Sequence, residues 1–264
     1  MGTLRILFLG DVVGEPGLRA VQARLHRLVA ETGAGLVVAN GENTAAGLGI
    51  TGATARALFS AGVHVITTGN HVWDKKEILG RLEHLPRLLR PANYPPGTPG
   101  VGWCTVEAGG VPVGVANLSG RIFMDPLDCP FQVADAVFAR FPPEVRVRLL
   151  DFHAEATSEK QAMGWHLDGR VTAVLGTHTH VATADARVLP GGTGYITDVG
   201  MSGVRDSVIG VSAGRAVERF RSRIPRGHAV AEGEATVCGV VVSADTASGR
   251  CTGIERVESG PPGS

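Results

Sequence analysis

The sequence contains few cysteines, and none of them forms a C-x-x-C pair. Four cysteines are spread over 264 residues, a spacing that suits neither a zinc knuckle nor a thioredoxin-like redox pair. They are Cys104, Cys129, Cys238 and Cys251. We therefore expect isolated thiols in a reducing compartment, which favours a cytoplasmic location.

The chain also lacks a long apolar segment. No stretch reaches the ~18 apolar residues that a membrane-spanning helix requires. The apolar opening at 1–10 is too short for a signal peptide, and it runs directly into Asp11 without a small-residue cleavage site. We expect a soluble protein that has no membrane partner.

Net charge is absent as well, because 25 Lys and Arg residues balance 25 Asp and Glu residues. No overall electrostatic field would recruit nucleic acid, so we expect no stable nucleic-acid partner and favour a small anionic ligand held by local chemistry.

With 44% apolar residues, the chain can bury a sizeable core. We predict a single domain over 1–258, followed by a Gly/Pro/Ser-rich, disordered tail at 259–264. Homo-oligomer formation remains open.

Short apolar runs alternate with helical patterns in the first third of the chain. The run Leu4–Leu9 is almost continuously apolar, as expected of a strand that is covered on both faces. Crossover helices between such strands favour parallel pairing. The expected strands are 4–9, 36–39 and 63–67, and the expected helices are 19–31, 51–61 and a charged helix at 74–83.

The rest of the chain predicts a hairpin and further short strands. Two β-type runs flank Gly109-Gly110, which indicates a β-hairpin. Strands are expected at 103–107, 111–116, 145–152, 171–175, 186–189, 195–197, 236–243 and 251–257, with helices at 131–140 and from about 157. The pattern predicts a layered α/β sandwich whose second sheet is partly antiparallel.

Polar side chains follow five of the predicted strands. Ligands of open α/β sheets bind at the carboxyl ends of strands, so we expect these side chains to meet at one edge. A single aspartate after a strand is more often a turn or cap residue, but the combination is stronger. The set comprises Asp11, Glu42, Asn43, Asn70, His71, His153, His178 and His180.

Mixed carboxylate, amide and imidazole ligands suit manganese, iron or zinc, and soft thiolates are missing from the set. A carboxylate that bridges two ions about 4 Å apart is typical of a two-metal site. Such a site would bind a phosphoester well, because the non-bridging oxygens can contact both ions.

The ordered motifs resemble the calcineurin-like metallophosphoesterases, and more closely their YmdB-like bacterial phosphodiesterase branch. The motifs are Gly10-Asp11, Gly41-Glu42-Asn43, Gly69-Asn70-His71, Asp151-Phe152-His153-Ala154-Glu155 and Gly176-Thr177-His178-Thr179-His180. The resemblance implies an α/β/β/α sandwich with mixed sheets.

Two positions depart from the broad superfamily pattern: Val13 replaces the histidine of D-x-H, and Glu42 replaces an aspartate. Asn43 is the best candidate to replace the missing histidine.

The resemblance also implies a role for each residue. One ion would be held by Asp11, Glu42, Asn43 and His180, and a second by Glu42, Asn70, His153 and His178, so that Glu42 bridges. Iron or manganese is expected, with zinc as a further option. His71 would protonate the departing alkoxide or hold the phosphate.

The implied activity is phosphodiester hydrolysis by a metal-bridging hydroxide, with cyclic nucleotides as substrates. The 2′,3′-cyclic class comes first, and 3′,5′-cyclic nucleotides and generic aryl phosphodiesters are further candidates. Arg121 could contact the phosphate and Phe123 could stack on a base, although both could equally belong to an exposed loop. Three alternatives stay open: a metal-bound regulatory protein with incidental hydrolase activity, a metal-dependent phosphomonoesterase, and a metal-dependent amidohydrolase.

Overall fold

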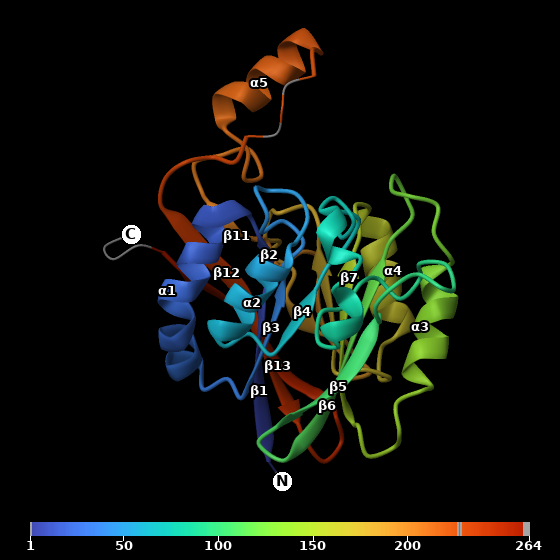
Figure 1. Cartoon of the computed structure of the whole chain (residues 1–264). Helices are drawn as coiled ribbons and strands as arrows, with labels where there is room; N and C mark the ends of the chain where they lie inside the picture. Colours follow the sequence, from blue (N-terminus) through green and yellow to red (C-terminus); the bar gives the residue numbers. More distant parts are fainter. Residues whose placement is uncertain (1, 226, 228, 261–264) are drawn as a thin grey trace.

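A computed structural model describes residues 2–225, 227 and 229–260. Its centre consists of two β-sheets that pack face to face, with helices over both outer faces (Figure 1). The sheets are mixed, because each contains both parallel and antiparallel pairs. The predicted α/β/β/α sandwich with mixed sheets is confirmed.

The first sheet has the order β2-β11-β12-β1-β3-β4, and β13 pairs with β12. β1, β3 and β4 run parallel to one another, as the predicted crossover helices require, whereas β12 runs antiparallel to β1. The strands are β1 (Thr3–Leu9), β2 (Asp11–Val12), β3 (Leu36–Asn40), β4 (Val65–Thr67), β11 (Met201–Val204), β12 (Ala235–Asp245) and β13 (Cys251–Ser259).

The second sheet has the order β5-β6-β7-β8-β10-β9. β5 and β6 form the predicted antiparallel hairpin, and β6, β7, β8 and β10 are parallel. The strands are β5 (Trp103–Ala108), β6 (Val111–Ser119), β7 (Val147–His153), β8 (Ala173–Thr177), β9 (Arg187–Val188) and β10 (Gly194–Ile196).

Three apolar layers hold the sandwich together. The central layer lies between the sheets, where Phe8 and Val38 of the first sheet belong to the same cluster as Val115 and Leu149 of the second. The other two layers lie under the helices of each outer face. Helices α1 (Gly14–Thr32) and α2 (Gly52–Ser60) cover the first sheet, and α3 (Pro130–Phe138) and α4 (Thr157–His166) cover the second.

Local sequence signals explain where α1 and α2 end and begin. Thr51 caps α2, because its side chain accepts a hydrogen bond from the Thr54 backbone N–H while the Thr54 hydroxyl accepts one from the Thr51 N–H. α1 ends at Gly33, whose φ of 65° is left-handed and suits glycine. Both helices therefore have sequence-encoded termini.

The predicted charged helix at 74–83 is wrong. Two separate 3-10 turns form instead, at Lys76–Ile78 and Leu82–His84. Gly80 lies between them and weakens a continuous helix. The Glu77 carboxylate accepts a hydrogen bond from the Gly52 N–H, which ties this segment to the start of α2. Tertiary contacts therefore override the local helical pattern here.

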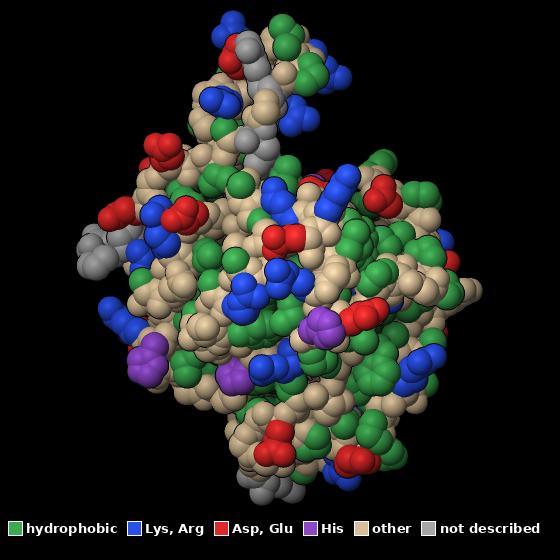
Figure 2. Space-filling view, viewed as in Figure 1, with side chains coloured by type: hydrophobic (Ala, Val, Ile, Leu, Met, Phe, Trp, Pro, Cys, Tyr) green, Lys and Arg blue, Asp and Glu red, His purple; other side chains and the backbone are tan. Residues whose placement is uncertain are grey.

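Helix α5 (Ala213–Ser222) was not predicted, and it projects away from the sandwich (Figure 1). Of its residues only Ala216 is buried, whereas Val217 and Phe220 are exposed. Figure 2 shows basic side chains over this projecting segment. Its arginines are Arg215, Arg219 and Arg221. The helical spacing of Ala216, Val217 and Phe220 is a signal that could have revealed it.

The end of the chain bears on the predicted tail. β13 reaches Ser259, the first residue of the segment predicted to be disordered, and residues 261–264 lie outside the described residues.

Within the part of the chain that the structure describes, no helix combines the length and apolarity needed to cross a bilayer. The four cysteines are free.

We expect Phe8→Ala to lower the free energy of unfolding by about 3–5 kcal/mol, because it opens a cavity between the sheets. Phe8 is fully buried in the central layer. Urea denaturation monitored by circular dichroism measures the loss. Phe220→Ala is the matched control, since Phe220 is 72% exposed and should change stability by no more than about 0.5 kcal/mol. Equal effects of the two substitutions would contradict this packing.

Candidate functional site

The eight residues predicted as metal ligands or as the catalytic acid lie at the carboxyl ends of strands, where the two sheets meet. The first sheet supplies five of them, in the segments after β1, β3 and β4. The second sheet supplies the other three, from the last residue of β7 and the loop after β8. The site therefore exists only when the sheets are packed together.

One group of ligand atoms surrounds the Nε2 atom of His153. This nitrogen lies 2.9 Å from Glu42 Oε1, 3.0 Å from Asn70 Oδ1 and 3.0 Å from His178 Nδ1. The ligand atoms of Glu42, His153 and His178 all lie within 4.8 Å of one another. These four residues are the set predicted for the second ion.

A second group lies beside the first and contains the residues predicted for the other ion. Asn43 Nδ2 lies 3.1 Å from His180 Nε2 and 3.5 Å from Asp11 Oδ1, and His180 Nε2 lies 3.6 Å from the same Asp11 oxygen. A 180° rotation of the Asn43 carboxamide would present its oxygen in place of Nδ2. Val13, which replaces the usual histidine, forms part of the apolar wall of the adjoining cavity.

The donor atoms are arranged as ligands of a metal ion, because hydrogen bonds among themselves cannot satisfy all of them. Glu42 Oε1 is buried, and no described group forms a hydrogen bond with it. His153 Nε2 carries at most one proton, yet three potential ligand atoms lie within 3.0 Å of it. Oxygen and imidazole ligands of this kind suit manganese, iron and zinc.

Buried residues behind His153 fix its orientation. The Thr177 hydroxyl donates a hydrogen bond to Asp151 Oδ1 at 2.7 Å, so its lone pairs can accept from His153 Nδ1, which is 2.9 Å away. A metal ion that displaced the proton of Nε2 would leave the remaining proton on Nδ1 and the Nε2 lone pair directed toward Glu42 and Asn70. A hydrogen-bonded partner of this type commonly fixes the tautomer of a metal-binding histidine.

The loop after β8 is held in a strained conformation. His178 and His180 have φ values of 102° and 64°, which are unusual for residues other than glycine. Asp198 Oδ2 accepts hydrogen bonds from both the N–H and the hydroxyl of Thr179 between them. The same oxygen lies 2.7 Å from Nζ of buried Lys160. A buried ion pair therefore holds both histidines in place.

Proximity within the site shifts the pKa values of its histidines in opposite directions. Burial alone would lower the pKa of His153, but the Glu42 carboxylate raises it to about 9. Burial, together with the charge of His153, lowers the pKa of His178 to about 3. Burial also opposes ionisation of Asp11, yet His180 and His153 hold its pKa below the usual range. At neutral pH, His178 therefore presents a lone pair to the site.

His71 differs from the predicted ligands in its surroundings. Its backbone N–H donates to Glu42 Oε2 at 3.1 Å, and its Nδ1 atom lies 3.0 Å from Asp74 Oδ2. The side chain is half-buried and lines the cavity. An imidazole oriented by a carboxylate on Nδ1 can use Nε2 to transfer a proton.

A cavity of about 260 Å³ opens beside these residues. Val13, Leu48, Ile209 and Val211 form apolar parts of its wall. Its polar lining residues are Glu42, Asn43, His71, Glu155, His178, Thr179 and His180. Convergent polar groups set in a concave wall with apolar parts are typical of a ligand site.

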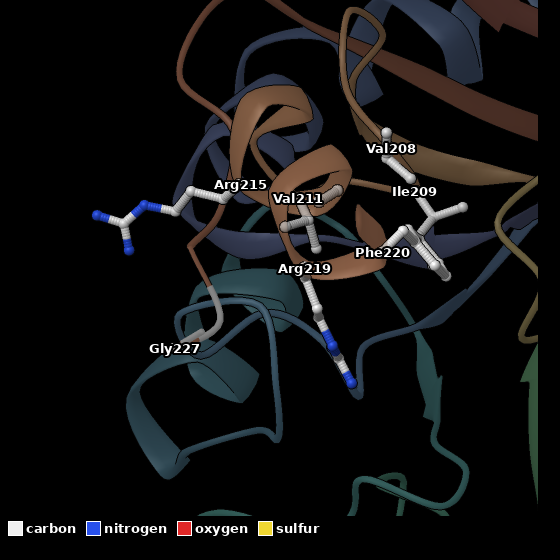
Figure 3. Close-up of a pocket in the computed structure, with 8 residues that line it drawn as sticks. Val208, Ile209, Val211, Arg215, Arg219, Phe220 and Gly227 are labelled. Carbon is white, nitrogen blue, oxygen red and sulfur yellow. The ribbon is translucent and has the colours of Figure 1, made fainter. Parts of the chain in front are cut away.

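A second hollow lies next to this cavity, under α5. It has a volume of about 130 Å³ and shares Ile209 and Val211 with the first. Figure 3 shows Phe220 and Arg219 of α5 together with these residues. Carboxylate and histidine side chains are absent from its described lining, so the chemistry belongs to the first cavity.

Arg121 does not line the cavity. Its side chain is exposed, and its backbone N–H lies 3.2 Å from both carboxylate oxygens of Glu159. Phe123, in the same loop, is 89% exposed with a φ of 62°. A phosphate contact by Arg121 therefore has no support from the geometry of the site.

Sequence reasoning missed several residues that position the site, among them Asp74, Asp151, Glu155, Thr177 and the Lys160–Asp198 pair. A signal existed for Asp151, because it stands two residues before His153 on a buried strand and so shares its face. The Oε2 atom of Glu155 lies 3.1 Å from His178 Nε2. The other contacts join segments far apart in sequence or within an irregular turn, and spacing alone does not reveal them.

Known structures and sequences match this fold along nearly the whole chain. The NAD nucleotidase of Haemophilus influenzae is 14% identical, with a TM-score of 0.60 over 98% of this chain and 56% of its own. A structure described as a novel phosphatase from Mycoplasma pneumoniae is 33% identical, with a TM-score of 0.92 over 99% of this chain and 96% of its own. The fold and its metal-type ligand set define the metallophosphoesterase class.

A protein-family model described as YmdB-like protein matches residues 7–257. The 2′,3′-cyclic-nucleotide 2′-phosphodiesterase of Bacillus subtilis (strain 168) is 47% identical over 254 residues, which cover 96% of each chain. This chain belongs to the YmdB-like family. The predicted family resemblance and the prediction of a metallophosphoesterase enzyme are confirmed.

We expect Gly69→Ala to disrupt the site while leaving the fold intact. An added Cβ would lie 2.1 Å from His153 Cδ2, so the imidazole must move away from Glu42 and Asn70. Bound metal per chain, measured by elemental analysis after reconstitution, should fall severalfold with an unchanged circular dichroism spectrum. Gly214→Ala is the control, because nothing lies within 4 Å of its added Cβ. Full metal content in Gly69→Ala would contradict the role of His153.

Proposed function

We propose that this chain is a dinuclear metal-dependent phosphodiesterase that hydrolyses cyclic nucleotides, with 2′,3′-cyclic nucleotides as the first class to test. The convergence of Glu42 Oε1, Asn70 Oδ1 and His178 Nδ1 on His153 Nε2, beside the Asp11–Asn43–His180 group, carries the proposal. The printed activity of the Bacillus subtilis relative supports the substrate class. 3′,5′-cyclic nucleotides are a second class to test.

The residues divide into two ligand sets that share Glu42. Its two carboxylate oxygens suit a bridging role, because Oε1 lacks a hydrogen bond among described groups and Oε2 accepts only the His71 N–H at 3.1 Å. Iron or manganese, with zinc as a further option, would suit the mixed oxygen and nitrogen donors. When bound, two ions would lower the pKa of a water molecule and balance the charge on the phosphate.

The chain's own residues would then orient the substrate and move one proton. A water oxygen forms the new bond to phosphorus, and the bond from phosphorus to the ribose oxygen breaks. His71 donates its Nε2 proton to that ribose oxygen while Asp74, 3.0 Å from Nδ1, stabilises the imidazolium before transfer. The water proton leaves to solvent, and the product is a phosphomonoester with a free hydroxyl group.

Hydrolysis of 2′,3′-cyclic AMP and bis-p-nitrophenyl phosphate tests this proposal. Metal-stripped protein, reloaded with manganese or iron, should recover activity with about two ions per chain. Asp11→Asn should abolish turnover, because it removes a charged ligand from a fully buried position. His71→Ala should retain the metal and lower kcat by about 10²–10⁴-fold, the usual contribution of general acid catalysis.

Three results would argue against the proposal. One ion per chain at full activity would rule out the dinuclear mechanism. Turnover of p-nitrophenyl phosphate alone would favour a phosphomonoesterase. Two bound ions with no turnover of either diester would favour a metal-bound regulatory protein.

A further inference from the structure

Glu155 is a carboxylate of the cavity that has no place in either predicted ligand set. It lies in the short connection between β7 and α4, and its side chain is 48% exposed while lining the cavity. Its Oε2 atom lies 3.1 Å from Nε2 of His178, on the side of the ring opposite the Nδ1 atom that faces His153. His178 therefore anchors this negative charge at the wall of the cavity.

The cavity offers no fixed cationic side chain to balance that charge. Among the described residues that line it, none is lysine or arginine. Sites that hold a dianionic phosphate group usually include arginine, whose fork of donors matches the phosphate oxygens. The ionisable side chains that line the cavity outside the two ligand sets are thus one anchored carboxylate, Glu155, and one imidazole, His71.

We infer that Glu155 is a specificity-determining residue that makes this cavity select monoanionic phosphodiesters over dianionic phosphomonoesters; this inference rests on the proposed function. A diester carries one negative charge, whereas a monoester near neutral pH carries almost two. The two classes therefore differ by one charge in their repulsion from Glu155. At a separation of about 6 Å and an effective dielectric constant of about 40, that difference gives a factor of about ten.

The same repulsion acts on the reaction product. Hydrolysis converts the monoanionic diester into a monoester that gains negative charge, so an anchored carboxylate favours release of the product. Because Glu155 is half exposed, salt should screen its effect, and the preference for diesters should weaken as ionic strength rises.

Glu155→Gln is the decisive variant. It removes the charge, while its amide oxygen can still accept a hydrogen bond from the Nε2–H of His178, so metal content should stay at the wild-type level. We expect the ratio of kcat/KM for bis-p-nitrophenyl phosphate to that for p-nitrophenyl phosphate to fall about tenfold. Calorimetry at pH 8 should also show inorganic phosphate, which is then mainly dianionic, binding about a hundredfold more tightly to the metal-loaded variant, because each of its two charges contributes a factor of about ten.

Glu107→Gln is the matched control, because Glu107 is an exposed carboxylate on β5 outside the cavity. It should leave the substrate ratio, phosphate affinity and metal content unchanged. An unchanged ratio and phosphate affinity in metal-replete Glu155→Gln would overturn the inference. Loss of metal in Glu155→Gln would also overturn it, since Glu155 would then act through His178.

The phosphate measurement separates this inference from the proposed function. If the wild-type protein hydrolyses neither ester but Glu155→Gln binds phosphate about a hundredfold more tightly, the proposed function fails while the charge selectivity of the cavity stands. If both esters are hydrolysed with the same ratio in the wild type and in Glu155→Gln, the proposed phosphoesterase function stands and the role of Glu155 is wrong.

Discussion

The buried carboxylate of Asp151 is the interaction on which the site depends. It accepts hydrogen bonds from Asn40 and Thr67 of the first sheet and from Thr177 of the second, while belonging to the second sheet itself. Burial raises the pKa of Asp151 to about 7, because a charged carboxylate is unfavourable at a position without solvent. This network fixes the two sheets relative to each other at the edge where the ligand sets meet.

The same network sets the chemistry of His153. Because the Thr177 hydroxyl donates to Asp151, it can accept from His153 Nδ1 and leave Nε2 available to the site. Glycine at position 69 then allows close approach, since any larger residue would occupy the position of the imidazole. The ion pair between Lys160 and Asp198 likewise holds the strained loop that carries His178 and His180 in its conformation. Polar groups buried at some cost therefore hold the ligand atoms in position, and the apolar layers provide the rigidity behind them.

The departures from the broad superfamily pattern also have a structural counterpart. Val13 adds an apolar wall to the cavity, while Asn43 lies beside Asp11 and His180. The cavity has no lysine or arginine among its described lining residues and contains Glu155, so its charge balance differs from that of a site built for a dianion. In the proposed phosphodiesterase, a carboxylate at this wall with no lysine or arginine among the described lining residues would act on substrate charge. Substrate choice in this chain would therefore reside in the wall of the cavity, beside a ligand set that could serve several phosphoesters.

The sequence by itself determined the layered fold, most strands and the eight residues at the strand ends, because apolar periodicity and strand-end position are local properties. It did not determine the 3-10 turns that replace the helix expected at 74–83, since the contact between Glu77 and Gly52 joins two segments. It also missed α5, although the spacing of its apolar residues carried a signal. The surroundings of Asp151, the contact of Glu155 with His178 and the position of Arg121 outside the cavity were decided only by the tertiary structure. These features depend on distances between side chains from different strands and loops, and such distances exist only after the two sheets have packed.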